Sequence, residues 1–533
     1  METHVNGEIN VEKRKKQIGI IGAGISGLVA CKHALEQGFN PIIFESSNCI
    51  GGVWSNTIES TKLQTPKDFY QFSDFAWPKS VAETFPNHNQ VKDYIESYAL
   101  HFNILKHIQF NTKVVTVDYC CEDDGEEIIA AGCDNLWGGT GRAFSPKCKW
   151  VVTVMDLLRP LHSHKVYEVD FIILCIGKFS GLPNIPHFPM NKGPEVFDGK
   201  VIHAMDYAEM GSVNATAIVK DKRVTVIGFQ KSAIDLAAEV ARLNGVKHPC
   251  TLLLRRVHWT VPEGFLKLSL RNLNRFSELM IHKPREGFFL WFLAILLSPL
   301  LWIFSKFAET YLKWIYPLKK YNMVPDHGFL RQISSCMFTV LPADFYKRVE
   351  EGSLILKKSK SYCFCKKGLI IDEEENLPLK TDIVIFATGY RSDDKLCNIF
   401  SSAYFQKCIT GSSTPFYREC IHPRIPQLAI LGYSESPAIL YTTEMQSKWL
   451  VHFLAGKFKL PTIAQMEEDV LRWEKCMQRY ACKYYKRACV SVLLQIYCND
   501  LLCRDMNLNP RRKKKMLSEL FAPYKPSDYQ RSV

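Results

Sequence analysis

The chain has 533 residues, of which 47% are hydrophobic and 23% are charged. This length allows two to four globular domains, and the composition excludes a disordered, collagen-like or coiled-coil protein. The net charge of +13 is spread along the chain, apart from the short basic runs KRKK around Arg14 and RRKKK from Arg511, so it does not indicate a nucleic-acid partner.

The 19 cysteines are too dilute for a disulfide scaffold, and no two have the CxxC spacing of zinc ribbons or thioredoxin-like dithiols. We therefore expect reduced thiols that serve mainly in packing, and no metal site. The first 17 residues are polar and basic without an apolar stretch, which predicts a protein that starts in the cytosol and is not secreted.

A strand–helix–strand pattern opens the chain. A short apolar strand from Ile18 to Ile21 leads into the loop GAGISG, and a helical stretch and a second strand follow it. The loop consists of Gly22, Ala23, Gly24, Ile25, Ser26 and Gly27. In such a loop the first glycine makes the turn, the second lets backbone N–H groups approach a pyrophosphate, and the third lets the helix pack closely on the strand.

The residues downstream of this loop favour a dinucleotide over an ordinary strand-to-helix turn. Glu45 ends the second strand, 18 residues after Gly27, where a carboxylate can accept from ribose hydroxyls. Because a carboxylate would repel a 2′-phosphate, the site is suited to FAD or NAD. Gly52 and Trp54 belong to the stretch GGVW, which offers a further close approach of the backbone.

A second unit of this kind appears at RVTVIGFQKSAIDLAAEVA, where a strand ends at Ile227 and a helix begins after the loop. The loop consists of Gly228, Phe229, Gln230, Lys231, Ser232 and Ala233. Gln230 stands where a second glycine is usual. Arg255 and Arg256 end the next strand, where guanidinium groups favour the 2′-phosphate of NADPH, although a solvated pair at a strand end is the alternative. Two such units indicate a flavoprotein that is reduced by NADPH and has no dithiol to pass electrons on.

The stretch FDGKVIHAMDY fits the FxGxxxHxxx(Y/F) motif of flavin-containing monooxygenases through Phe197, Gly199, His203 and Tyr207. The chain resembles that family also in GAGISG, GGVW, DFIILCIG and FATGY, so the resemblance covers essentially its whole length. It implies that NADPH reduces FAD, that molecular oxygen adds to the flavin, and that the resulting C4a-hydroperoxyflavin oxygenates a nucleophilic nitrogen or sulfur of a small molecule. Tyr207, where Baeyer–Villiger enzymes carry Trp, favours the N- and S-oxygenating branch. His203 is expected to be a packed, hydrogen-bonded histidine.

The stretches TKLQ, FSDFAWP, KKYNMVPDH and MNLNPRRK are similar to the plant subgroup that includes the pipecolate N-hydroxylase of systemic acquired resistance. The resemblance therefore implies a role in plant defence, with pipecolic acid as one candidate substrate. Many animal members carry Asn near the flavin N5 edge, and Gln64 occupies the matching position here. We hypothesise that Gln64 helps to hold the hydroperoxide, the alternative being that it is a turn residue.

The run from Phe288 to Phe304 is apolar over 17 residues except at Ser298 and Pro299. At 1.5 Å per residue it would reach about 25 Å, short of a bilayer core, and Pro299 is expected to break or kink it. A buried helix pair, a helix lying in a membrane surface and a membrane span are the alternatives. Because animal relatives associate with membranes, the cytoplasmic side of the endoplasmic reticulum is the expected location.

We expect an α/β fold with two Rossmann-like dinucleotide-binding domains. Residues 1–178 and 388–533 are predicted to form a discontinuous FAD-binding domain, and residues 179–387 an inserted NADPH-binding domain with an apolar helical insertion at about 262–345. An uncoupled NADPH oxidase that produces hydrogen peroxide and a non-catalytic binding protein of this fold are the competing functions. The sequence leaves the oligomeric state open.

Overall fold

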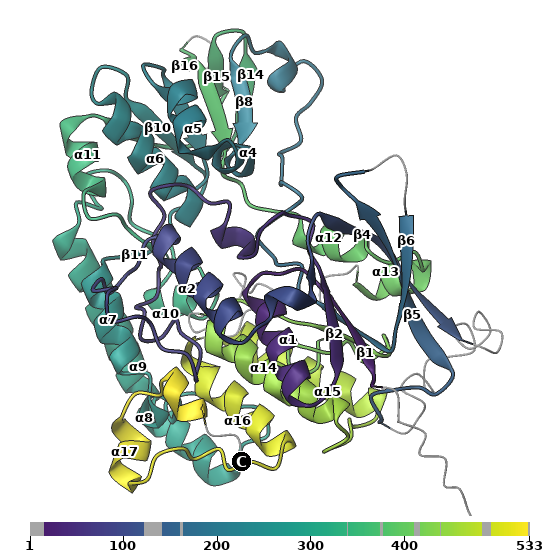
Figure 1. Cartoon of the computed structure of the whole chain (residues 1–533). Helices are drawn as coiled ribbons and strands as arrows, with labels where there is room; N and C mark the ends of the chain where they lie inside the picture. Colours follow the sequence, from purple (N-terminus) through teal and green to yellow (C-terminus); the bar gives the residue numbers. More distant parts are fainter. Residues whose placement is uncertain are drawn as a thin grey trace, which may run out of the picture.

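The structure is a computed structural model that describes residues 15–121, 141–159, 164–337, 339–373, 377–409, 416–436, 439–481 and 492–530. It contains two five-stranded parallel sheets, which confirms the expected fold class of two Rossmann-like units (Figure 1). Each sheet has helices on one face and a three-stranded antiparallel sheet on the other. Both faces are therefore covered, as apolar parallel strands require.

The first sheet has the strand order β18-β7-β1-β2-β3. Its strands are β1 (Gln17–Ile21), β2 (Asn40–Phe44), β3 (Ile108–Gln109), β7 (Phe171–Leu174) and β18 (Leu428–Ile430). Helix α1 (Ile25–Glu36) lies on one face, under α14 (Ile439–Leu454). The other face packs against β4 (Thr112–Cys121), β5 (Cys148–Asp156) and β6 (His164–Val169).

The second sheet has the order β13-β10-β9-β17-β8 and forms the upper part of Figure 1. Its strands are β8 (Lys200–His203), β9 (Val224–Ile227), β10 (Cys250–Leu254), β13 (Leu354–Lys358) and β17 (Ile383–Phe386). Helices α6 (Lys231–Asn244) and α11 (Phe345–Glu351) cover one face, near α4 (Ala204–Glu209) and α5 (Gly211–Val219). The other face packs against β14 (Tyr362–Cys365), β15 (Gly368–Ile371) and β16 (Leu379–Lys380).

The chain leaves the first sheet after β7, builds the second, and returns to the first sheet at β18. The domain boundaries at residues 178 and 387 remain a prediction; both positions lie in these crossing segments. Between β10 and β13 come β11 (Thr260–Val261), α7 (Glu263–Arg271), α8 (Arg275–Glu278), α9 (Phe288–Ile315), α10 (Phe329–Ile333) and β12 (Thr339–Val340). The remaining α-helices are α2 (His88–His101), α12 (Ser392–Cys397), α13 (Ala403–Ile409), α15 (Ile463–Ala481), α16 (Gln495–Asp505) and α17 (Met516–Phe521).

The expectation that the cysteines are reduced is wrong for Cys121, Cys148 and Cys336, which are disulfide-bonded. Cys121 and Cys148 face each other across β4 and β5, with their Cα atoms 4.1 Å apart, and they form a disulfide. Directly opposed residues of an antiparallel pair bring their side chains within bonding reach. Their separation of 27 positions along the chain concealed this pairing in the sequence.

Pro299 was expected to break or kink the run, and the break is wrong, because α9 continues through it as a helix of 28 residues. At 1.5 Å per residue this helix is about 42 Å long. Proline has no N–H to donate to the carbonyl of Ile295, and the Ser298 hydroxyl donates to that carbonyl instead, over 2.9 Å. The side chain of Ser298 thus replaces the missing backbone bond.

Helix α9 is not a buried helix either. Its most apolar 18-residue window is 17% buried, and within the described residues it is the one helix long and apolar enough to cross a membrane by length and composition. Its buried side chains form one edge, made of Ala294, Leu301, Ser305, Ala308, Glu309 and Leu312. Much of the rest of its apolar surface is exposed, including Phe288, Phe289, Leu296, Trp302 and Phe307.

Candidate functional site

A cavity of about 2300 Å³ lies where the carboxyl ends of the two parallel sheets face each other. Residues that follow β1, β2, β7 and β18 line it on one side, and residues that follow β8, β9, β10, β13 and β17 line it on the other. Ligands of open parallel sheets bind at this end of the strands. Because pockets for single small molecules usually measure about 300–1000 Å³, the cavity has room for more than one ligand.

The first glycine loop forms a backbone cradle beside the cavity. Gly22 has a φ of +104°, and a Cβ there would lie 2.5 Å from the carbonyl oxygen of Cys175. A Cβ on Gly52 would lie 3.2 Å from the Cα of Gly24, so the GAGISG and GGVW segments touch through bare backbone. Gly24 is the N-cap of α1 and supplies no side-chain cap, which leaves the N-terminal N–H groups of the helix to a ligand. This cradle fits a pyrophosphate.

The carboxylate of Glu45 closes this cradle. Its Oε2 accepts from the backbone N–H of Ala23 over 2.6 Å, and its Oε1 accepts from the N–H of Ser47 over 2.8 Å. Glu45 is 8% exposed and lines the cavity. It is therefore fixed at the end of β2, where the ribose of a dinucleotide would lie.

The second loop is built differently. Gly228 has a φ of +142°, and a Cβ there would lie 2.4 Å from the carbonyl oxygen of Ala387. Gln230 is the N-cap of α6 and, with Phe229, Lys231 and Ser232, lines the cavity. A glycine is thus required at the turn, while a side chain is accommodated at the N-cap.

Positive side chains follow the neighbouring strands of the second sheet. Arg255 and Arg256 come directly after β10, are exposed and line the cavity. Lys360 follows β13 and lines it too, and β13 pairs with β10. Sequence reasoning missed Lys360, because only the sheet order brings the two strand ends together.

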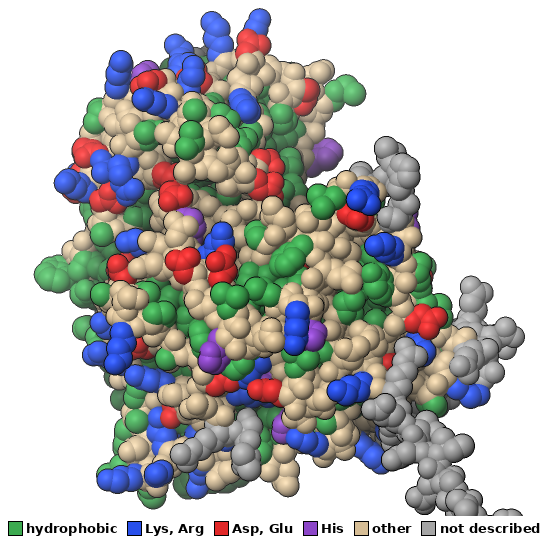
Figure 2. All heavy atoms as spheres, in the orientation of Figure 1, with side chains coloured by type: hydrophobic (Ala, Val, Ile, Leu, Met, Phe, Trp, Pro, Cys, Tyr) green, Lys and Arg blue, Asp and Glu red, His purple; other side chains and the backbone are tan. Residues whose placement is uncertain are grey.

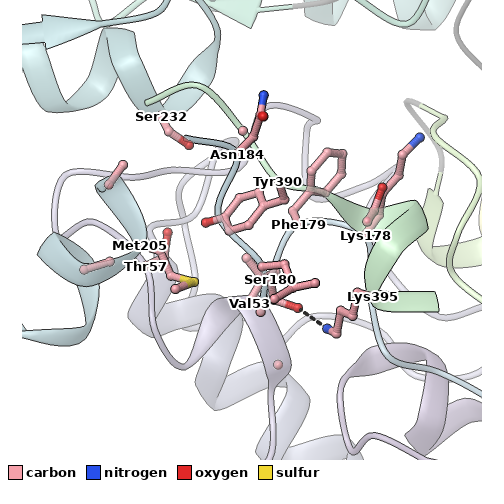
Figure 3. Close-up of a pocket in the computed structure, with 18 of the residues that line it drawn as sticks. Val53, Thr57, Lys178, Phe179, Ser180, Asn184, Met205, Ser232, Tyr390 and Lys395 are labelled. Carbon is pink, nitrogen blue, oxygen red and sulfur yellow. Dashed lines mark hydrogen bonds between the residues drawn. The ribbon is translucent and has the colours of Figure 1, made fainter. Parts of the chain in front are cut away.

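The two segments that connect the sheets pair with each other at the cavity. Asn184 donates its N–H to the carbonyl of Gly389 over 2.9 Å, and Arg391 donates its N–H to that of Leu182 over 2.9 Å. Lys395 of α12 reaches across and donates to Ser180 Oγ over 3.0 Å (Figure 3). It also donates to the carbonyl of Ile176. Burial lowers the pKa of Lys395 to about 8, against the opposing effect of the Glu45 carboxylate. Lys395 is a second cavity residue that the sequence did not single out.

Gln64 lines the cavity, as the sequence hypothesis requires of it. Its Oε1 accepts from the backbone N–H of Val340 in β12 over 3.2 Å. The amide is therefore oriented, with Nε2 as the end that remains for a ligand.

The motif residues around β8 are packed. A Cβ on Gly199 would lie 2.3 Å from the ring of Phe197. His203 caps α4, its Nδ1 accepting from the N–H of Met205 over 3.1 Å, and burial lowers its pKa. Tyr207 is 2% exposed and donates its hydroxyl to Glu239 over 3.0 Å.

Most of the predicted site residues line the cavity. The exceptions are Ala23, Gly27 and Ala233, which shape the loops from behind. Gly27 illustrates this role, because a Cβ there would lie 1.9 Å from the carbonyl oxygen of Gly22.

Comparisons with known proteins agree with this arrangement. The sequence profile described as flavin-binding monooxygenase-like matches residues 15–127 and 142–505. A probable flavin-containing monooxygenase 1 of Arabidopsis thaliana is 37% identical over 523 residues, which cover 96% of each chain. Two solved structures share the fold. S-allyl-L-cysteine S-oxygenase from Allium sativum has a TM-score of 0.55 at 18% identity over 93% of this chain and 89% of that one. An open form of cyclohexanone monooxygenase has a TM-score of 0.64 at 14% identity over 92% of this chain and 97% of that one.

The profile match and the relative at 37% identity both run through the two nucleotide units and the cavity between them. The chain therefore belongs to the flavin-binding monooxygenase-like family and is an FAD- and NADPH-dependent monooxygenase with molecular oxygen as its co-substrate.

Proposed function

We propose that this monooxygenase oxygenates a nucleophilic nitrogen, or sulfur, of a small molecule. The observation that carries the proposal is that both glycine loops and Gln64 line one cavity, so nicotinamide, flavin and substrate would share one space. FAD, when bound, supplies the electron transfer and the activation of oxygen. The protein then has to bind the cofactors and the substrate, orient them, and exclude water.

The roles of the binding residues follow from their geometry. The backbone around Gly22, Gly24 and Gly52 would hold the FAD pyrophosphate, and Glu45 the adenosine ribose. The N-terminus of α6 from Gly228 to Ser232 would hold the NADPH pyrophosphate, with Arg255 and Arg256 at the 2′-phosphate. Lys360 would be a third cation for that phosphate.

Gln64 would act at the reacting centre. With its Oε1 fixed by Val340, its Nε2 can donate a hydrogen bond to an oxygen atom beside the flavin. The cavity lining also includes Leu63, Leu266 and Met337, which are apolar and disfavour water.

We propose the plant N-hydroxylating subgroup as the closest functional class, with pipecolic acid as the first substrate to try and plant defence as the setting. This rests on the stretches TKLQ and KKYNMVPDH and on Tyr207 in the motif position that favours N- and S-oxygenation. The relative at 37% identity carries only the general name of flavin-containing monooxygenase, so the substrate is the part to be tested.

The test is the ratio of oxygenated product to NADPH consumed, measured by mass spectrometry and absorbance with pipecolic acid, other cyclic amino acids, tertiary amines and thioethers. We expect a ratio near one for at least one amine, and no comparable turnover with NADH. If every candidate gives only hydrogen peroxide, the chain is an uncoupled oxidase. If the purified chain takes up no FAD, it is a binding protein of this fold.

We also propose that α9 attaches the protein to the surface of a membrane, with the cytoplasmic side of the endoplasmic reticulum as the location. Phe289, Leu296 and Trp302 are 74%, 64% and 60% exposed, and hydrophobic side chains project along the left edge of Figure 2, where Figure 1 places α9. An exposed apolar stripe of this size favours a lipid contact.

The attachment would be flat and not a span. Ser305 Oγ accepts from the N–H of Leu330, and Glu309 Oε1 accepts from the N–H of Phe329, each over 3.1 Å, so α10 is bound along the second half of α9. A helix held to the protein along one edge presents only its other face to lipid. The triple variant F289S/L296S/W302S should remain in the supernatant when the wild type sediments with phosphatidylcholine vesicles. A wild type that stays in the high-speed supernatant without detergent would contradict the attachment.

A further inference from the structure

The segment from Ile58 to Gln64 follows the GGVW stretch of the first nucleotide unit, yet several of its side chains and N–H groups bind elements of the second. The backbone N–H of Ser60 donates to Glu239 Oε2 over 3.0 Å, and the hydroxyl of Thr61 donates to Asp235 Oδ2 over 3.2 Å. Both acceptors lie on α6, 179 residues after Ser60 and 174 residues after Thr61. At the other end, Gln64 is held by Val340 of β12.

Asp235 and Glu239, the two carboxylates on α6, each form hydrogen bonds to both nucleotide units. Asp235 binds Lys231 Nζ with Oδ1, over 2.7 Å, and Thr61 with Oδ2. Glu239 binds the hydroxyl of Tyr207 with Oε1 and Ser60 with Oε2. Each carboxylate therefore has one oxygen bonded within its own unit and one bonded to the segment that carries Gln64.

Burial of Asp235 makes the loss of its hydrogen bond to Thr61 costly. Asp235 is 2% exposed, and burial raises its pKa while Lys231 and Thr61 act to lower it. A buried carboxylate that loses a donor is costly, so this arrangement of the segment is strongly favoured over one in which Thr61 turns away. Asp235 and Glu239 are four residues apart on one helix, so they present a single face to the segment.

The backbone of the segment is also anchored in its own unit. Leu63 donates its N–H to the carbonyl of Pro86 over 2.9 Å, and the carbonyl of Thr61 accepts from the N–H of His88 over 3.1 Å. The first unit thus holds the backbone at Thr61 and Leu63, whereas the hydroxyl of Thr61 and the amide of Gln64 are held by the second unit.

We propose that Asp235 and Glu239 are positioning residues, and that with Ser60 and Thr61 they form a latch that sets Gln64 only when the two nucleotide units are docked as in this structure. The same helix α6 begins with Lys231 and Ser232, which line the cavity, so a nicotinamide dinucleotide bound there would rest on the element that holds the latch. The inference rests on the proposed role of Gln64, and it predicts that opening the latch separates NADPH oxidation from oxygen transfer.

Thr61 offers a matched pair of variants. Thr61→Val keeps the shape and removes the hydroxyl, whereas Thr61→Ser keeps the hydroxyl. In the FAD-free protein, hydrogen–deuterium exchange of a peptide over residues 57–65 should be at least threefold faster in Thr61→Val than in the wild type, and close to wild type in Thr61→Ser. In the FAD-loaded protein, Thr61→Val should release at least three times more of its NADPH electrons as hydrogen peroxide, with KM for NADPH within twofold of wild type. Thr61→Ser should restore the coupling.

The latch is refuted if exchange of this peptide is the same in Thr61→Val and wild type, or if exchange rises and coupling does not change. Gln64→Ala is the partner experiment, because it should uncouple the enzyme without the faster exchange at residues 57–61. A wild type that transfers no oxygen to any substrate would contradict the proposed function, and the exchange experiment would still report on the latch.

Discussion

The two glycine loops lie at equivalent places, each directly after the central strand of its five-stranded sheet, yet they are closed to different degrees. In the first, Gly24 meets Gly52 across bare backbone and Glu45 bonds to the loop from the side. In the second, Gln230 faces the cavity, and the cations that follow β10 are exposed.

This difference matches two kinds of ligand. A cradle closed on two sides suits a cofactor that stays bound, as a flavin does through many turnovers. A loop that is open in front and flanked by exposed guanidinium groups suits a nucleotide that must enter and leave in each cycle. Four predictions test this contrast, and the largest effect is expected at the tightest contact.

Gly27 and Ala233 are the corresponding third positions of the two loops. Gly27→Ala should destabilise the protein by about 3 kcal/mol and abolish FAD retention, because the new methyl group would overlap the carbonyl of Gly22. Ala233→Gly should cost only about 1 kcal/mol, the usual helix penalty of glycine. Urea unfolding and the flavin content of the purified protein measure both. Equal effects at the two positions would contradict the contrast.

Arg255 and Arg256 are next in expected effect. The double variant R255A/R256A should lower the preference for NADPH over NADH, as the ratio of their kcat/KM values, by about 2 kcal/mol or roughly thirtyfold, because charge-assisted bonds to the 2′-phosphate are lost. R271A removes an exposed arginine on α7 and serves as the control. If the preference persists, the 2′-phosphate is bound elsewhere, and Lys360 is the next residue to replace.

Lys395 lies on the same side of the cavity as the first cradle. Its lowered pKa predicts that the free energy of unfolding depends on pH. Its folded pKa of about 8 lies below the ordinary value of 10.5, so between these values the unfolded chain binds more protons and stability rises with pH. Between pH 8 and pH 9 the wild type should gain about 1 kcal/mol in free energy of unfolding relative to Lys395→Met. Urea unfolding of the FAD-free proteins measures it. Parallel pH profiles would show that Lys395 titrates normally.

Gln230 should have the smallest effect. Because its side chain faces open cavity, Gln230→Gly is expected to change KM for NADPH by less than threefold. A drop of tenfold or more would mean that Gln230 obstructs the pyrophosphate, and that the second loop is less open than its geometry indicates.

The sequence was sufficient for the features that depend on local pattern. The strands beside Gly22 and Gly228, and the acidic and basic residues that follow the next strands, lie within about thirty residues of each other, and their order along the chain predicts the two units. The family motifs add the order of the cofactors.

Features that depend on distant pairs could not be read in this way. Lys360 lies near Arg255 only because β13 pairs with β10. Cys121 and Cys148 are bonded although they are 27 positions apart, and Thr61 contacts Asp235, which lies 174 residues further along the chain. The predicted break at Pro299 was wrong for the opposite reason. Proline does remove the backbone donor to the carbonyl of Ile295, but the hydroxyl of the neighbouring Ser298 donates to that carbonyl in its place.

That small bond at Ser298 constrains which sequences this helix can accept. Proline at position 299 leaves the carbonyl of Ile295 without its backbone donor, and residue 298 offsets that loss when its side chain can donate, which Ser and Thr can do and Ala and Leu cannot. With any other residue at 299, the donor at 298 becomes dispensable. The two positions should therefore change together, and a survey that substitutes them one at a time would assign to each a sensitivity that belongs to the pair.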